Sequence, residues 1–175
     1  MAGALDGTRP VSANDGWETV GGDIVGIHDY TQDPSLIDER YGSLDAIAAL
    51  LASGRADGRA ADVDRAPLGR RAPMLTEFGG IAMATDVEDG ARMGTDGTAW
   101  GYDEVRSTED FVGRYCELWA AVHRSEALAG ACWTQLTDTC QEVNGLLTAE
   151  RTPKAPIEVL AEATRGVGRS RWRPR

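Results

Sequence analysis

A carboxylate at the end of an apolar segment is the strongest candidate for chemistry in this sequence. Glu77 closes the segment 72–77 and is followed by Phe-Gly-Gly at 78–80. Glycines at that point leave room for another group to approach the carboxylate closely. A carboxylate so placed can act as a nucleophile, a general base or a metal ligand. The structural alternative, a Glu77 side chain bound to nearby backbone or to an arginine, is equally compatible with the spacing.

Two polar ring side chains follow another apolar segment. His28 and Tyr30 lie two positions apart at the end of the segment 23–28, so on a strand they share one face. They could orient a neighbouring carboxylate or contact a hydroxyl-rich ligand. The alternative is a hydrogen-bonded core histidine beside a space-filling tyrosine, and the pattern alone slightly favours that alternative.

Three tryptophans, Trp17, Trp100 and Trp133, fall at or after the ends of expected strands. An indole face in such a place can stack on a sugar or on another flat ligand. Trp119 differs because it lies within an expected helix, which predicts a core position.

The histidines and cysteines do not have the spacing of a metal site. The 2 histidines and 3 cysteines form no Cys-x-x-Cys pair with His-x-x-x-His, and no Walker loop, GxSxG or GxGxxG motif is present. The sequence therefore predicts no metal and no cofactor. The odd number and wide spacing of Cys116, Cys132 and Cys140 argue against a disulfide framework and predict reduced thiols in a cytoplasmic protein.

Short apolar segments alternate with amphipathic ones along the chain. Strands are expected over 9–14, 23–28, 72–77 and 130–136, and helices over 35–51, 108–127 and from 156 onward. The alternation predicts an α/β fold of about four βα units around a parallel sheet. In such folds the functional groups follow the carboxyl ends of the strands, which is where Asn14 and Asp15 also fall.

Local signals refine these boundaries. Ser35 is a candidate cap for the first helix, Gly42 and Ser43 interrupt it, and Ser107 is expected to cap the helix that follows. Residues 54–71 have no period and are expected to form a solvated loop. A long polar loop is expected over about 82–106, and loops of that length are often functional.

Composition narrows the classes of protein. The chain has 175 residues, with 18 Lys+Arg against 28 Asp+Glu and a net charge of −10. That acidic balance argues against a nucleic-acid or membrane-surface binder, because both need positive potential. No signal peptide and no membrane-spanning segment is visible. A complete (β/α)8 barrel needs roughly 200–250 residues, more than this chain has.

Four ordered blocks resemble a known family. They are 9–18, 23–30, 76–80 and 132–146, which read RPVSANDGWE, DIVGIHDY, TEFGG and CWTQLTDTCQEVNGL. Together they are similar to the carboxyl-terminal half of the catalytic TIM barrel of glycoside hydrolase family 2, which includes β-galactosidases, β-glucuronidases and β-mannosidases. The resemblance implies strands 5 to 8 of the barrel within residues 1–165. Residues 166–175 have no counterpart in the family, and their basic composition predicts a disordered tail.

The same resemblance implies a role for each candidate residue. Glu77 matches the nucleophile of a retaining β-glycosidase, His28 and Tyr30 lie at the strand beside it, and Trp133 matches an aromatic sugar platform. The pocket-lining loop after the first of these strands is matched by Asn14, Asp15 and Trp17. The implied substrate is a β-linked saccharide, in a hydrolase of carbohydrate metabolism such as a β-galactosidase.

One part of the family pattern is missing. The acid/base of the family is the glutamate of an Asn-Glu pair, and no Asn-Glu pair occurs in these 175 residues. We therefore expect a fragment that carries the nucleophile and is inactive alone. The alternative is a non-catalytic sugar-binding or assembly half-barrel that needs a partner chain. Half a barrel would expose sheet edges, so a homo-oligomer or a complementing half-barrel is also expected.

Overall fold

The computed structural model describes residues 2–53, 60–64, 67–83 and 101–166. Trp100 and nearly all of the expected tail at 166–175 therefore lie outside the described residues. Within them the chain is an α/β fold with parallel strands, as the alternation predicts. No helix in the described ranges is long and apolar enough to cross a membrane.

Three parallel strands form the main sheet. They are β1 (Ile24–Asp29), β2 (Ala72–Gly79) and β5 (Gly130–Thr134), in the order β1-β2-β5. Apolar side chains on β1 and β2 are buried, which is why these short segments form strands. Each of these strands was predicted, with β2 extending two residues further and β5 ending two residues earlier than expected.

The strand expected over 9–14 does not form as a ladder. Only Ser12 pairs with β1, through a single parallel bridge to Ile24. Val11 instead bonds to Asp23: its amide donates to the Asp23 side chain at 2.8 Å, and its carbonyl accepts from the Asp23 amide at 2.7 Å. These bonds close a loop, and Pro10 has no amide proton to extend the pairing.

A second, two-stranded parallel sheet replaces part of the long loop expected over 82–106. It pairs β3 (Ile81–Met83) with β4 (Asp103–Val105). The segment between these strands lies outside the described residues. Both strands are too short to show a period, so the sequence pattern did not indicate them.

The helices are α1 (Ala2–Leu5), α2 (Pro34–Tyr41), α3 (Leu44–Ser53), α4 (Thr108–Arg124) and α5 (Ile157–Arg165), with a 3-10 turn at Leu68–Arg70. The expected break at Gly42 separates α2 from α3. Ser107 caps α4 by accepting from the Asp110 amide at 3.1 Å, as predicted. The cap of α2 is Asp33 rather than Ser35, because the Asp33 carboxylate accepts from the Ser35 amide at 2.8 Å.

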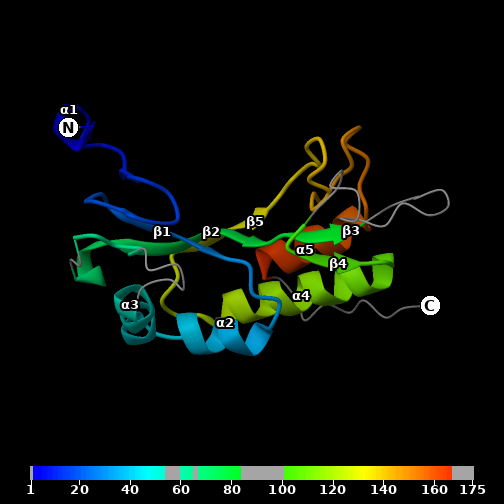
Figure 1. Cartoon of the computed structure of the whole chain (residues 1–175), viewed down its shortest axis with the longest axis horizontal. Coiled ribbons are helices and arrows are strands. Elements are labelled where there is room, and N and C mark those ends of the chain that lie inside the picture. The colour runs from blue at the N-terminus through cyan, green and yellow to red at the C-terminus, as the bar shows by residue number, and fades with distance from the viewer. Residues whose placement is uncertain (1, 54–59, 65–66, 84–100, 167–175) are drawn as a thin grey trace.

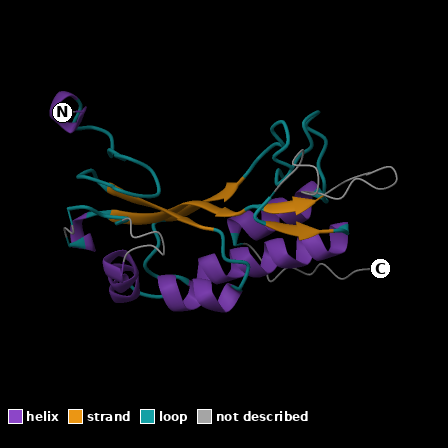
Figure 2. Ribbon diagram, viewed as in Figure 1, coloured by secondary structure: helices purple, strands orange, loops and turns teal. Residues whose placement is uncertain are grey.

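Helices α2, α3 and α4 lie on one face of the main sheet, and α5 packs against α4 (Figures 1 and 2). The core between sheet and helices is centred on fully buried side chains of β2 and α4. These are Leu75, Phe78, Phe111, Tyr115 and Leu118. Trp119 is 5% exposed in the same core, which confirms its predicted position.

Two leucines test this assignment of the core. Leu75 in β2 is 0% exposed, whereas Leu136 is 67% exposed. We expect Leu75→Ala to lower the free energy of unfolding by about 2–5 kcal/mol, because it removes buried contacts and leaves a cavity. The matched variant Leu136→Ala should change it by less than about 0.5 kcal/mol. Urea unfolding measures both, and equal losses would contradict this placement of the core.

Candidate functional site

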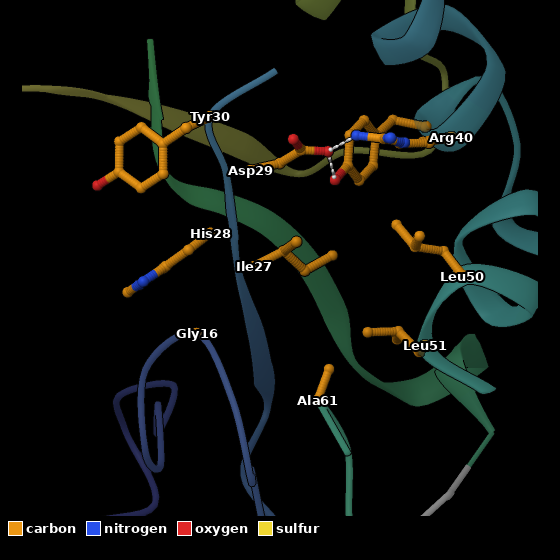
Figure 3. A pocket seen from close by; sticks show the side chains of 10 residues that line it. Gly16, Ile27, His28, Asp29, Tyr30, Arg40, Leu50, Leu51 and Ala61 are labelled. Carbon is orange, nitrogen blue, oxygen red and sulfur yellow. Dashed lines mark hydrogen bonds and ion pairs between the residues drawn. The ribbon is translucent and has the colours of Figure 1, made fainter. Parts of the chain in front are cut away.

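The candidate nucleophile lies where β1 and β2 run side by side toward their carboxyl ends. Glu77 of β2 is in register with His28 of β1, just after an irregularity in the pairing between Ile27 and His28. Side chains alternate along β1: His28 and Tyr30 point to one side of the strand, and Ile27 and Asp29 point to the other (Figure 3). This alternation places His28 and Tyr30 on one face, as their two-residue spacing predicts, and both side chains contact Glu77 there.

Two groups hold the Glu77 carboxylate. The hydroxyl of Tyr30 donates a hydrogen bond to Oε2 of Glu77, and Nδ1 of His28 lies 3.2 Å from the same oxygen. The Glu77 side chain is 37% exposed, so the carboxylate is oriented by its neighbours and still open to solvent. An oriented, accessible carboxylate can serve as a nucleophile, a general base or a metal ligand.

A second carboxylate lies on the other side of the imidazole. Oδ2 of Asp15 is 3.4 Å from Nε2 of His28, and Oδ1 of Asp15 accepts a hydrogen bond of 2.6 Å from the Thr76 hydroxyl. Thr76 immediately precedes Glu77 but was not predicted as a site residue. Its position next to the carboxylate is the only sequence signal that could have indicated it.

Two glycines make room for this arrangement. Gly16 has φ +83°, and a Cβ there would lie 2.5 Å from Nδ1 of His28. A Cβ on Gly26, in the middle of β1, would collide with the Asp15 carboxylate and the Thr76 hydroxyl. The approach of Asp15 and His28 to one another therefore requires residues without a side chain at both positions.

Asn14 and Trp17 form the turn that carries Asp15. The Asn14 side-chain amide donates to the Trp17 carbonyl at 2.7 Å, and the Asn14 carbonyl accepts from the Thr19 hydroxyl at 2.9 Å. The Trp17 ring meets His28 edge-on, with centroids 5.1 Å apart and planes at 70°. The structure thus brings Trp17 to the site, whereas the Asn14 amide is engaged within its own turn.

Trp133 lies in the core. It is 7% exposed and meets Phe78 and Tyr115 edge-on, at centroid distances of 5.2 Å and 4.5 Å. The Trp133 ring packs directly on Gly79, where a Cβ would lie 2.6 Å from the ring atoms. The sugar-platform role of Trp133 stays a prediction, and this burial does not support it.

Two further residues position Tyr30. The Gln32 side-chain amide donates to the carbonyls of Tyr30 at 3.0 Å and of Gly79 at 2.6 Å, which ties the ends of β1 and β2 together. The Tyr102 ring stacks on the Tyr30 ring with centroids 3.4 Å apart and planes at 9°. Tyr102 falls within the loop expected over about 82–106, where no pattern indicates a contact with Tyr30.

The opposite side of β1 is joined to the helix layer. Asp29 accepts hydrogen bonds from Arg40 at 2.8 Å and from the Tyr41 hydroxyl at 2.6 Å. These residues line a cavity of about 360 Å³ that reaches α3 at Leu50 and Leu51 (Figure 3). Burial, reinforced by Asp29, raises the pKa of Tyr41, so this hydroxyl remains a donor.

Solved structures similar to this chain are glycosidases. A family 2 β-galacturonidase from Eisenbergiella tayi, bound to galacturonate, has a TM-score of 0.55 and 18% identity over 96% of this chain and 29% of its own. A β-glucuronidase from Faecalibacterium prausnitzii has a TM-score of 0.52 and 21% identity, over 98% and 28% of the two chains. A β-D-glucuronidase from Dictyoglomus thermophilum has a TM-score of 0.50 and 18% identity, over 97% and 28%.

The likeness to these enzymes is one of fold. The chain spans less than a third of the length of each of them. No protein-family profile and no curated protein matches the sequence. The chain therefore has a fold like part of these glycoside hydrolases, at identities that show a common fold and not a common reaction.

The Tyr30 hydroxyl leads to a prediction about alkaline pH. Burial raises the pKa of Tyr30, and its hydrogen bond to Glu77 raises it further. An unfolded tyrosine loses its proton at about pH 10. The folded chain therefore keeps a proton that the unfolded chain releases, and stability falls as the pH rises above that value.

In Tyr30→Phe the unfolded chain releases one proton fewer at alkaline pH. We therefore expect the unfolding free energy of this variant to fall less steeply with pH than that of the parent chain. Urea unfolding between about pH 9 and 11 measures the slope of the unfolding free energy against pH. Trp17→Phe alters the same site without changing a titratable group and should keep the parent slope. A Tyr30→Phe slope equal to that of the unmodified chain would mean that Tyr30 titrates alike in both states.

Proposed function

We propose that this chain is the carboxyl-terminal half of the catalytic barrel of a retaining β-glycosidase and that Glu77 is its nucleophile. In this proposal residues 1–165 contribute strands 5 to 8 of a (β/α)8 barrel. The reaction is hydrolysis of an O-glycosyl bond in a β-linked saccharide. The observation that carries the proposal is the Glu77 carboxylate at the carboxyl end of β2, held there by Tyr30 and His28. The glycosidase-like fold supports the reaction class.

The contacts of Glu77 suit nucleophilic attack. The Tyr30 hydroxyl engages Oε2, which fixes the carboxylate plane and leaves Oε1 for the anomeric carbon of the sugar. Attack forms a bond between Glu77 and the sugar as the glycosidic C–O bond breaks, and the leaving-group oxygen takes a proton from the acid/base. Water, deprotonated by the same acid/base, then displaces Glu77 and releases the sugar with retained configuration.

Asp15 does not fit the role of the acid/base. In retaining enzymes the two carboxyl groups lie about 5–5.5 Å apart with the sugar between them. Here both carboxylates contact the same imidazole, Asp15 at 3.4 Å from Nε2 of His28 and Glu77 at 3.2 Å from Nδ1, so they share a neighbour instead of facing a sugar from two sides. The proposed enzyme therefore takes its acid/base from outside these 175 residues, as the missing Asn-Glu pair implies.

The sheet is compatible with further strands. β5 is an outer strand of the sheet, and β1 is bridged on its outer side at Ser12 by the segment that stands for strand 5. All three strands run in one direction, so strands of a complementing half-barrel could pair beside β5 and beyond the Ser12 segment. The solved glycosidases, of which this chain spans less than a third, are long enough to include them. The partner in this proposal is therefore the other half of the barrel, and the ligand is a β-linked sugar.

Glu77 can be tested by covalent labelling. We expect a 2-deoxy-2-fluoro β-glycoside with a dinitrophenyl leaving group to modify Glu77, because such a leaving group departs without acid assistance and the fluorine slows release of the sugar. The reagent is applied to the longest open reading frame that contains these 175 residues. Peptide mass spectrometry locates the added sugar.

Two variants control the labelling. Glu77→Gln should abolish it, whereas Glu104→Gln, a half-exposed carboxylate on β4, should leave it unchanged. A label on Asp15, or one that persists in Glu77→Gln, would show that the nucleophile is another residue. Glucuronide, galacturonide and galactoside reagents used in parallel identify the sugar.

The 175-residue chain alone should not turn over aryl β-glycosides. Acid–base assistance typically contributes about 10²–10⁴-fold to the rate, and loss of half the pocket removes positioning as well. Release of nitrophenol from the same three sugars measures this. Turnover that disappears in Glu77→Gln would show that the chain is complete as a catalyst. Saccharide binding without turnover, unchanged in Glu77→Gln, would instead support a non-catalytic sugar-binding half-barrel.

A further inference from the structure

A buried ion pair lies behind the turn that carries Asp15 and Trp17. Arg71, the residue before β2, donates to both carboxylate oxygens of Asp62: Nη1 donates to Oδ1 at 3.1 Å, and Nη2 donates to Oδ2. The side chain of Arg71 is 7% exposed and that of Asp62 is 5% exposed. The sequence pattern predicts a solvated loop over 54–71, so it gives no indication that these two charges are buried together.

The segment that carries Asp62 is paired with the end of this turn. Thr19 and Asp62 form a parallel bridge: the Thr19 amide donates to the Ala61 carbonyl at 3.0 Å, and the Thr19 carbonyl accepts from the Val63 amide at 3.0 Å. Thr19 is 0% exposed, so this pairing is shielded from water. The residues around Asp62 therefore support the turn along its backbone.

Thr19 closes the turn, which comprises residues 14–19. Its hydroxyl donates to the Asn14 carbonyl at 2.9 Å, which fixes the two ends of the turn to each other. Asp15 and Trp17 lie between these ends and contact His28, through Oδ2 of Asp15 at 3.4 Å and the Trp17 ring at a centroid distance of 5.1 Å. A continuous series of contacts therefore runs from the buried ion pair to the imidazole of the site.

We propose that Arg71 and Asp62 are positioning residues, whose ion pair holds the turn against His28. A buried ion pair is often no more stabilising than apolar side chains of similar volume, because removing two charges from water offsets their attraction. The planar fork of an arginine on a carboxylate does, however, select one relative placement of the two segments that carry them. Here those segments are the start of β2, which also carries Glu77, and the segment paired with the turn.

A turn held in this way has a consequence for the proposed reaction. In the proposed enzyme the turn lines the sugar pocket, so a loosened turn weakens sugar binding while Tyr30 still holds Glu77. This consequence rests on the proposed function, whereas the placement of the turn does not. The placement can be measured without a substrate, so its failure and that of the labelling experiment are distinguishable.

Carbon–proton magnetic resonance of the histidines measures the placement of the turn in the 175-residue chain. The chain contains 2 histidines, so without a histidine tag its spectrum has one imidazole Cε1–Hε1 signal from each, and His123→Gln identifies the one from His28. The ring current of Trp17, whose ring centroid is 5.1 Å from that of His28, shifts this signal. Trp17→Leu removes the ring current and gives the position of the signal without the contact.

The double variant Asp62→Leu/Arg71→Met is the main test. It removes both charges together, so neither is left buried without its partner, and the replacements are apolar side chains of similar volume. We therefore expect the chain to remain folded and the His28 signal to lose more than half of its ring-current shift. The His123 signal should not move, because His123 stacks on Trp119 of the same helix, at a centroid distance of 5.5 Å.

A second ion pair provides the matched control. Arg124 donates to both carboxylate oxygens of Asp38, at 2.9 Å and 2.6 Å, and joins α4 to α2 in the helix layer. Asp38→Leu/Arg124→Met should leave the His28 signal at its parent position. A His28 signal that moves equally in both double variants would assign the change to a general loosening of the fold and overturn the positioning role.

Circular dichroism checks that each variant is folded. An unmoved His28 signal in a folded Asp62→Leu/Arg71→Met chain would overturn the proposal, and so would a signal at one position in both the parent and Trp17→Leu. If the double variant fails to fold, Arg71→Lys decides, because lysine keeps the charge but lacks the planar fork. We then expect the His28 signal to move part of the way toward its Trp17→Leu position, and an unmoved signal would contradict the positioning role.

Discussion

The parallel pairing of β1 with β2 is the constraint on which the site depends. It places His28 opposite Glu77 and Asp29 opposite Phe78. Because successive side chains alternate, His28 reaches the carboxylate while Asp29 turns to Arg40 on the helix side. A slip of one residue would exchange these faces, moving Asp29 away from Arg40 and the imidazole into the helix layer. The Asp29–Arg40 ion pair and the His28–Glu77 contact therefore both require the same register between β1 and β2.

The elements with a clear local signal were predictable from the sequence. Buried apolar segments indicated β1, β2 and β5, and Gly42 indicated the break between α2 and α3. The errors arose where a local hydrogen bond competes with a pattern. Asp33 rather than Ser35 caps α2, and bonds between Val11 and Asp23 leave a single bridge where a strand was expected. Strands as short as β3 have no period that a sequence can display.

The site was predictable in part. The position of Glu77 after a strand and the two-residue spacing of His28 and Tyr30 both indicated convergence at one sheet edge, and the structure brings these groups together. The contact of Asp15 with the imidazole was not predictable, since it depends on how a turn folds back over β1. Trp133 was expected at a strand end with its ring available for stacking, whereas it lies within β5 and its ring is buried.

The two glycines beside the site limit how the sequence can vary. Gly16 and Gly26 carry no reactive group, yet a methyl group at either position would meet His28 or Asp15. Gly16 also has a positive φ that other residues rarely adopt. We therefore expect related sequences to accept fewer residue types at Gly16 and Gly26 than at an exposed polar position such as Asn14. The shape of the site thus depends on two glycines, Gly16 and Gly26, that take no part in its chemistry.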